Sequence, residues 1–124
     1  MKLLLDTHVV LWWRSDSAKL TRTVRRAIAS TDIVLVSAAS GWEVALKLGV
    51  GKLRLADSFA WMVSDSKFTE LPVALTHTEQ LTALPSHHRD PFDRMLIAQA
   101  QVEGATLVTH DRQFKPYDVP VVWV

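Results

Sequence analysis

The sequence predicts an α/β protein in which helices flank a short central parallel sheet on both faces. Short segments rich in Leu, Val and Ile indicate strands that are buried on both sides. Amphipathic segments of helical period lie between these strands, and such alternation is typical of parallel sheets. The length of 124 residues suits one unit with its own core. We therefore expect a single domain over residues 1–124.

Four segments are predicted strands. Residues 3–5, 33–36 and 106–109 are short and apolar, with β-branched or leucine side chains. The C-terminal residues 119–124 are also rich in β-forming side chains and predict a last strand. Pro120 stands near the start of that segment, where its missing N–H is tolerated.

Helices are predicted between the strands. Apolar residues recur at helical spacing in residues 21–30 and 39–48. The residues that share a face are Val24, Ala27 and Ile28 in the first helix and Trp42, Ala45 and Leu46 in the second. Residues 58–64 and 78–84 predict shorter helices. Residues 91–103 form the best-marked helix, with Asp90 at the N-cap, Pro91 at the first position and Gly104 just past the end.

Composition and motif content exclude several classes of protein. Without cysteine the chain has no disulfide, no thiolate metal site and no cysteine nucleophile. The sequence contains neither G-x-G-x-x-G nor a Walker A motif, and Ala38-Ala39-Ser40-Gly41 lacks the frame of a nucleophile elbow. No stretch approaches the roughly 18 apolar residues of a membrane span, and the N-terminal apolar run is too short for a signal peptide. We expect a cytoplasmic protein with no membrane contact.

The net charge of +1, from 14 basic and 13 acidic residues, provides no overall basic surface for nucleic acid. A charged partner must then be bound by a local patch.

Acidic residues follow three of the predicted strands. Asp6 comes directly after the first, Asp111 follows the third, and Glu43 lies in the first turns of the helix after the second. Because the carboxyl ends of parallel strands meet at one edge, where ligands collect, these acids are candidate site residues. The alternative is that Asp6 and Asp111 only cap the helix or turn that follows each of them.

Two acids are predicted to share an apolar helix face. Glu43 is aligned with Ala39, Leu46 and Val50, and Asp93 is aligned with residues 96, 97 and 100. An unpaired acid there would cost several kcal/mol unless it were neutralised or bound to metal. The ordinary alternatives are a salt bridge between Glu43 and Lys47, and a favourable place for Asp93 in the first turn of its helix. Asp90 is predicted to cap that helix, and a supporting role in a metal site remains open.

Four carboxylates, Asp6, Glu43, Asp93 and Asp111, make an oxygen-ligand site suited to Mg²⁺ or Mn²⁺. Such an ion can deprotonate water for attack on a phosphodiester and stabilise the leaving oxygen. Paired acids without metal would instead act as in glycosidases, for which the chain looks small.

Basic and aromatic residues lie near these acids in the sequence. Candidate phosphate contacts, each of which is more often ordinary surface charge, are Lys47, Arg94, Arg112, Arg22, Arg25 and Arg26. The adjacent His87 and His88 could suggest a metal pair, but polar loop surface is the favoured interpretation. His8 and His110 flank two acids, and contact with substrate is the less favoured interpretation for both. Trp12 and Trp13 are adjacent and cannot face the same way, so one is expected to meet a partner.

Four segments together resemble PIN-domain proteins, and specifically the ribonuclease toxins of VapBC-type toxin–antitoxin pairs. The resemblance covers essentially the whole chain, and the segments run in family order. They are Leu3-Leu4-Leu5-Asp6-Thr7-His8, Val36-Ser37-Ala38-Ala39-Ser40-Gly41-Trp42-Glu43, residues 87–100 from His87-His88 to Gln99-Ala100, and Leu107-Val108-Thr109-His110-Asp111.

This resemblance implies a PIN-like fold and a Mg²⁺- or Mn²⁺-dependent endoribonuclease. Asp6 and Asp93 match the principal metal ligands, and Glu43 and Asp111 match acids that complete the site directly or through water. Thr109 matches a hydroxyl that the family places near its fourth acid, and Thr7 is counted among the candidate substrate contacts. The expected partners are RNA, a VapB-type antitoxin whose tail enters the acidic groove, and a second copy of the chain.

Two other functions remain as alternatives. A receiver-like signalling domain is of similar length and binds Mg²⁺, but it would have an acidic pair after the first strand and a lysine at the end of a late strand. This chain has Thr7 and His8 after Asp6, and Thr109 and His110 at the late strand. A catalytically silent PIN-like domain would only bind RNA or protein, and the intact set of acids argues against it.

Overall fold

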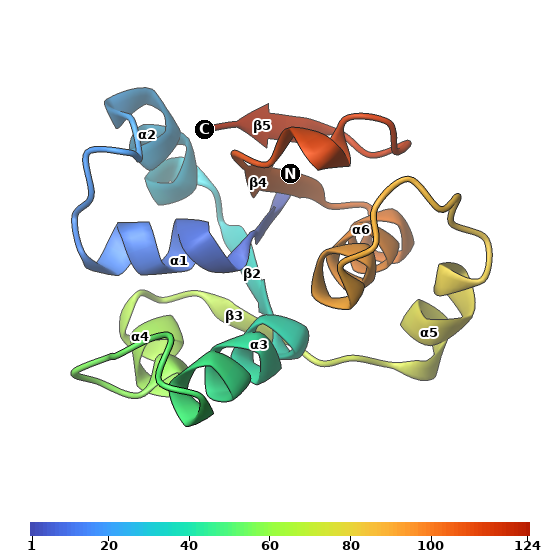
Figure 1. The fold of residues 1–124 in the computed structure, drawn as a ribbon. Helices are drawn as coiled ribbons and strands as arrows, with labels where there is room; N and C mark the ends of the chain where they lie inside the picture. Colours follow the sequence, from blue (N-terminus) through green and yellow to red (C-terminus); the bar gives the residue numbers. More distant parts are fainter.

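Five parallel strands form one sheet in the computed structural model, which describes all of residues 1–124 (Figure 1). The strands are β1 (Lys2–Leu5), β2 (Ile33–Ser37), β3 (Thr69–Leu71), β4 (Thr106–Thr109) and β5 (Val121–Trp123). Their order across the sheet is β3-β2-β1-β4-β5, and each neighbouring pair is parallel. The first strand is therefore central, and its C-terminal end lies between those of β2 and β4.

Six α-helices and one 3₁₀ turn connect these strands. They are α1 (Thr7–Arg14), α2 (Arg22–Ser30), α3 (Ala38–Gly49), α4 (Phe59–Asp65), α5 (Leu75–Leu81), α6 (Pro91–Glu103) and the 3₁₀ turn η1 (Arg112–Phe114). The longest of them has 13 residues, and none has the length and hydropathy required to cross a membrane.

Two hydrophobic clusters cover the two faces of the sheet. Leu3 and Leu5 point into one cluster and Leu4 into the other, because successive side chains of a strand alternate between faces. Helices α1, α2 and α4 contribute to the first cluster, whereas α6 contributes to the second and α5 packs against it. Figure 1 shows the two groups of helices on opposite sides of the strands. The predicted α/β architecture is confirmed.

The sequence prediction missed one strand and displaced one helix. In β3, Thr69 and Glu70 are exposed and only Leu71 is buried, so this edge strand has no apolar run. The helix predicted over residues 78–84 begins earlier, at Leu75, and ends at Leu81. Its only buried residue is His77, while Leu75 is 81% exposed. Apolar spacing could not locate a helix that is held by a buried polar residue.

The apolar residues chosen for the inner face of α3 point outward. Trp42 and Leu46 are 62% and 49% exposed, and Val50 is 69% exposed. The buried residues of this helix are Ala39, Ser40, Glu43 and Val44. The argument that Glu43 shares an inward stripe with Leu46 and Val50 is therefore wrong, although Glu43 itself is buried. The helix turns polar residues inward because it packs against the edge where the acids lie.

The predicted ends of α6 are confirmed. Asp90 caps the helix, since its Oδ1 accepts hydrogen bonds from the N–H groups of Phe92 and Asp93. Pro91 lies in the first turn, and Gly104 ends the helix with a φ of 64°, a left-handed conformation that favours glycine. Because the two caps set the first and last residues of α6, they place Asp93 in its first turn.

Candidate functional site

Asp6 is buried at the C-terminal end of the central strand. Its side chain accepts a hydrogen bond at Oδ2 from Thr109 Oγ1, at 2.7 Å, and the residue is 4% exposed. Asp6 is the N-cap residue of α1, as the alternative predicted, but its side chain makes no cap hydrogen bond and is turned to Thr109 instead. Burial raises the pKa of Asp6, while the hydrogen bond from Thr109 lowers it.

The Thr109 hydroxyl joins the ends of two neighbouring strands. It donates to Asp6 and accepts a hydrogen bond from the Asp111 N–H at 3.0 Å. Thr109 is fully buried. One side chain thus sets the orientation of the Asp6 carboxyl and the course of the backbone that carries Asp111.

Glu43 is held by two hydrogen bonds to its carboxylate. Thr7 Oγ1 donates to Oε1 at 2.8 Å, and Lys47 Nζ donates to Oε2 at 3.0 Å. The salt bridge with Lys47 is therefore present, as the ordinary alternative predicted. Glu43 is nevertheless only 8% exposed and close enough to Asp6 to raise its pKa. Thr7 and Lys47 position this acid within the cluster.

Asp93 lies where the negative charges converge. Its pKa is raised to about 8, first by burial and then by the charges of Asp6, Asp90, Glu43 and Asp111. These residues come from the end of β1, the start of α6, the middle of α3 and the end of β4. The four predicted site acids are therefore neighbours at one edge of the sheet.

Asp111 combines a capping role with a place in the cluster. Its Oδ1 accepts a hydrogen bond from the Gln113 N–H at 3.0 Å, which caps η1 as the alternative predicted. Its Oδ2 points elsewhere and lies 3.5 Å from His88 Nε2. One oxygen of Asp111 serves the turn, and the other faces the acid cluster.

His88 is a residue that sequence reasoning considered for a metal pair but assigned to the surface. It is 7% exposed, so its predicted place on the polar surface is wrong, whereas His87 is exposed. His88 Nε2 lies 2.8 Å from Asp93 Oδ2, and its Nδ1 accepts a hydrogen bond from the Asp90 N–H at 3.3 Å. The signals in the sequence were the adjacent histidine pair and the closeness of His88 to the N-cap of α6.

The donor set at this edge fits a divalent cation. Donor atoms of His88, Asp93 and Asp111 all lie within 4.8 Å of one another. His88 Nε2 is buried without an aligned hydrogen-bond partner, although Asp93 Oδ2 is near. Since Nδ1 accepts from the Asp90 N–H, the proton of a neutral His88 lies on Nε2 and faces Asp93. The carboxylates of Asp93 and Asp111 lie close together, and a divalent cation would offset their mutual repulsion.

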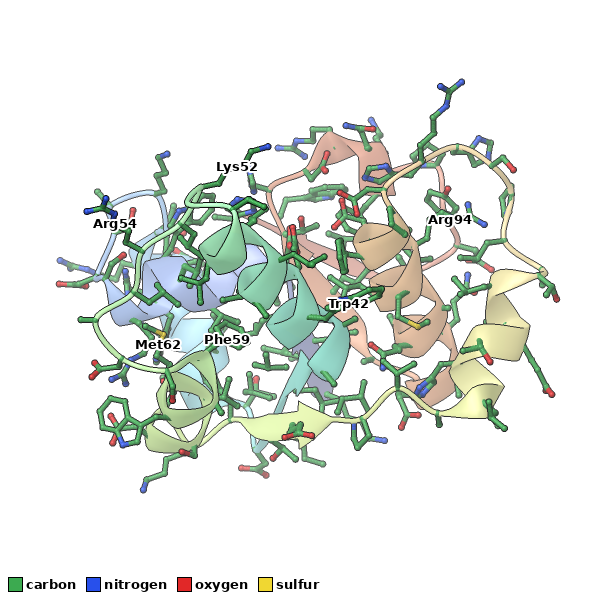
Figure 2. The ribbon with its side chains drawn as sticks, turned by 60° about the horizontal axis from the view of Figure 1, so that its bottom comes forward. Trp42, Lys52, Arg54, Phe59, Met62 and Arg94 are labelled. Atoms are coloured by element: carbon green, nitrogen blue, oxygen red, sulfur yellow. The ribbon has the colours of Figure 1, made fainter.

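Several side chains predicted as phosphate contacts make hydrogen bonds or stacking contacts within the protein. Arg94 Nη1 donates to the Pro85 carbonyl at 2.9 Å and lies 3.4 Å from the Tyr117 hydroxyl, which ties α6 to the loop before it (Figure 2). Arg25 donates to the carbonyls of Leu20, Ser17 and Trp12. Arg112 stacks its guanidinium over the Trp123 ring at 4.5 Å. Arg22 and Arg26 are exposed on α2.

The paired tryptophans face different neighbours, as expected for adjacent helical residues. Trp12 lies against His110 with ring centroids 4.8 Å apart, and Trp13 lies against Phe68 at 5.6 Å. Both pack partly against the core. The most exposed tryptophan is Trp42, which projects from α3 toward α6 in Figure 2 and meets Phe92 edge-on at 5.0 Å.

Comparison with known proteins places the fold and the sequence in one family. The model of the PIN domain family matches residues 3–120. The chain is 32% identical to Ribonuclease VapC22 of Mycobacterium tuberculosis, over 98% of each chain. The crystal structure of VapBC2 from Rickettsia felis, bound to a DNA fragment from its promoter, contains a chain with a TM-score of 0.75 at 17% identity, covering 98% of both chains. A chain of DNA-bound VapBC from Salmonella typhimurium has a TM-score of 0.69 at 20% identity, covering 98% of this chain and 97% of that one. The protein therefore belongs to the PIN domain family.

Proposed function

We propose that this protein is a metal-dependent endoribonuclease that acts as the toxin of a VapBC-type toxin–antitoxin pair. The observation that carries the proposal is the convergence of Asp6, Glu43, Asp93 and Asp111 at one sheet edge. There, burial together with the neighbouring charges raises the Asp93 pKa to about 8. The 32% identity to a protein named as a ribonuclease supports the same activity over the full length.

Some site residues would bind the cation, and others hold these ligands in place. Asp6 and Asp93 would be the principal ligands, with Glu43 and Asp111 completing the site directly or through water. His88 Nε2, which carries the ring proton when Nδ1 accepts from the Asp90 N–H, would hold the Asp93 carboxylate in place. A bound Mg²⁺ or Mn²⁺ would supply an activated water and stabilise the leaving oxygen of the phosphodiester.

The surrounding residues of the chain prepare these groups. The Thr109 hydroxyl orients the Asp6 carboxyl, and Thr7 with Lys47 orients that of Glu43. Asp93 holds a proton at neutral pH while the site is free of metal, because its pKa is raised to about 8. Cation binding requires the release of this proton, so the occupancy of the site should rise with pH.

The partners follow from the same relatives. Solved neighbours are toxin–antitoxin assemblies, and we extend an antitoxin partner and an RNA substrate to this chain. We also propose a homodimer and one catalytic domain over residues 1–124. The receiver-like alternative is not favoured, and the complete set of acids argues against a silent PIN-like domain.

RNA cleavage by purified variants tests the activity and the site together. Asp6→Asn and Asp93→Asn should abolish cleavage of cellular RNA in Mg²⁺ or Mn²⁺, with circular dichroism unchanged. Asp32→Asn is the matched control, because Asp32 is exposed and stands before β2, at the N-terminal ends of the strands and away from the acids. EDTA should abolish the activity of the wild type. Cleavage at the wild-type rate by both site variants would refute the proposal.

A second experiment identifies the RNA that is cut in cells. The ends of RNA fragments formed after induction would be sequenced for the wild type and for Asp93→Asn. Cuts that appear only with the wild type define the target. An unchanged RNA population after induction of the wild type would contradict a toxin that acts on RNA.

A further inference from the structure

Three aromatic side chains form a cluster beside the acid site that the proposed mechanism does not use. The cluster, here called the aromatic platform, consists of His8, Trp12 and His110. The ring centroids of Trp12 and His110 are 4.8 Å apart, those of His8 and His110 are 5.7 Å apart, and those of His8 and Trp12 are 5.9 Å apart. All three pairs lie within the range of aromatic contact.

The platform remains open to solvent. His8 and His110 are exposed, and Trp12 is partly exposed although its other side packs against the core. A hollow of about 280 Å³ opens beside it and is lined by Trp12, Lys19, His110 and Val124. Lys19 Nζ lies 5.5 Å from the centroid of the Trp12 ring, which places a positive charge at the same hollow.

The chain places this platform next to the acids. His110 stands between Thr109, whose hydroxyl binds Asp6, and Asp111, whose Oδ2 faces His88. Since neighbouring Cα atoms are about 3.8 Å apart, His110 is one backbone step from two residues of the site. His8 follows Asp6 by two residues, in the first turn of α1.

These features match the chemistry of an unpaired nucleotide. Single-stranded RNA is held by aromatic side chains that stack on the bases and by cations that meet the phosphates. A hydrophobic peptide would be expected to fill an apolar groove, whereas this hollow has histidine and lysine at its rim.

We propose that the aromatic platform stacks one unpaired base of the RNA substrate next to the scissile phosphate, with Lys19 meeting a neighbouring phosphate. The proposal rests on the endoribonuclease function argued above and adds a positioning site to it. His8 and His110 supply ring faces here, and neither takes part in the bond cleavage. The platform restricts the substrate to RNA with at least one unstacked base near the cut.

Binding of a defined RNA probe tests the stacking. The probe is a single-stranded RNA of about 12 nucleotides that carries one 2-aminopurine, moved along the strand in a series, with Ca²⁺ in place of Mg²⁺ to limit cleavage. At one position its fluorescence should be quenched by the wild type. His110→Ala should remove the quenching and weaken binding about 5- to 150-fold, the range for loss of one base–aromatic stack. His110→Phe keeps an aromatic face and should restore both.

Matched variants separate stacking from charge and from folding. Lys19→Gln should lower the salt dependence of binding by about one phosphate contact, a slope change of roughly 0.7 for single strands, while Lys67→Gln should not. Lys67 is also exposed, but it lies before β3, at the N-terminal ends of the strands and away from the platform. Trp61→Ala removes an exposed aromatic ring on α4 and should leave binding unchanged. Thermal unfolding confirms that each variant folds.

The results distinguish failure of the platform from failure of the function. Wild-type cleavage of cellular RNA is measured in parallel, and its absence would overturn the ribonuclease proposal itself. If the wild type cleaves RNA but binds the probe no better than His110→Ala does, the platform proposal is overturned. The same holds if His110→Ala loses only the binding of the antitoxin, which would make the platform a protein-binding surface.

Discussion

Replacement of Asp93 by asparagine should stabilise the metal-free protein while it abolishes catalysis. Burial, and then the charges of Asp6, Asp90, Glu43 and Asp111, raise the pKa of Asp93 from 3.8 to about 8. A carboxyl whose pKa is raised on folding costs stability as it ionises, and this cost is absent below about pH 3.8 and complete above about pH 8. Asparagine keeps the shape of the side chain and removes the charge.

The structure sets an upper limit on the gain. The interval from 3.8 to about 8 corresponds to about 5 kcal/mol at pH 8 and to about 1.7 kcal/mol at pH 5, because each pH unit is worth about 1.4 kcal/mol. The side chain is 13% exposed and keeps some contact with water, so we expect about half of each value. For a chain of this length, the gain at pH 8 raises Tm by roughly 10 °C.

Urea denaturation and thermal unfolding in EDTA, at pH 5 and pH 8, measure the effect. The gain of Asp93→Asn over the wild type should be about three times larger at pH 8 than at pH 5. Added Mg²⁺ or Mn²⁺ should stabilise the wild type and leave Asp93→Asn nearly unchanged. Asp32→Asn, with an exposed carboxyl, should show no such pattern. A variant that is less stable than the wild type at pH 8, or a gain that does not depend on pH, would refute the reasoning.

Three further variants test the elements that support the site. Thr109→Val should cost about 1–3 kcal/mol of unfolding free energy and most of the RNA cleavage, because Asp6 and the Asp111 N–H both lose a buried partner. Thr109→Ser keeps the hydroxyl and should keep both the stability and the activity. Urea denaturation and cleavage rates measure these effects. Arg94→Ala should lower the cleavage rate, because it loosens the loop that carries His88. Hydrogen exchange should then show faster exchange of the His88 amide, and unchanged exchange would refute this prediction. Gly104→Ala should lower the free energy of unfolding by about 1 kcal/mol, since residue 104 adopts a φ of 64°. The cleavage rate at low temperature should not change. An unchanged Tm would contradict the strain argument.

Much of the fold and of the acid set could be predicted from local patterns. Residues 3–5 are a continuous apolar run, and residues 106–109 are all leucine or β-branched, as in buried parallel strands. Each segment leads directly to a polar edge. The Asp90, Pro91 and Gly104 signals marked both ends of α6, because caps depend on residues next to the helix. The acids at the strand ends could be assigned to one edge of the sheet because parallel strands all end on the same side.

Other features depended on contacts between distant parts of the chain. Helical spacing identified which residues of α3 share a face, but the direction of that face was set by packing, which turned Glu43 inward and Trp42 outward. His88 has the sequence surroundings of a surface loop, and it is buried because Arg94 and Tyr117 hold its loop against α6. The edge strand β3 carries no apolar signal and is defined by its pairing with β2.

The sequence by itself determined the identity of the acids, the strands they follow and the caps of α6, because each of these rests on neighbouring residues. Only the tertiary structure decided which side chains hold those acids. The Thr109 hydroxyl meets Asp6 across 103 residues of chain, and Thr7 meets Glu43 across 36. Such pairs form only when parallel strands bring their ends to one edge, and the burial that follows raises the pKa of Asp6 and Asp93.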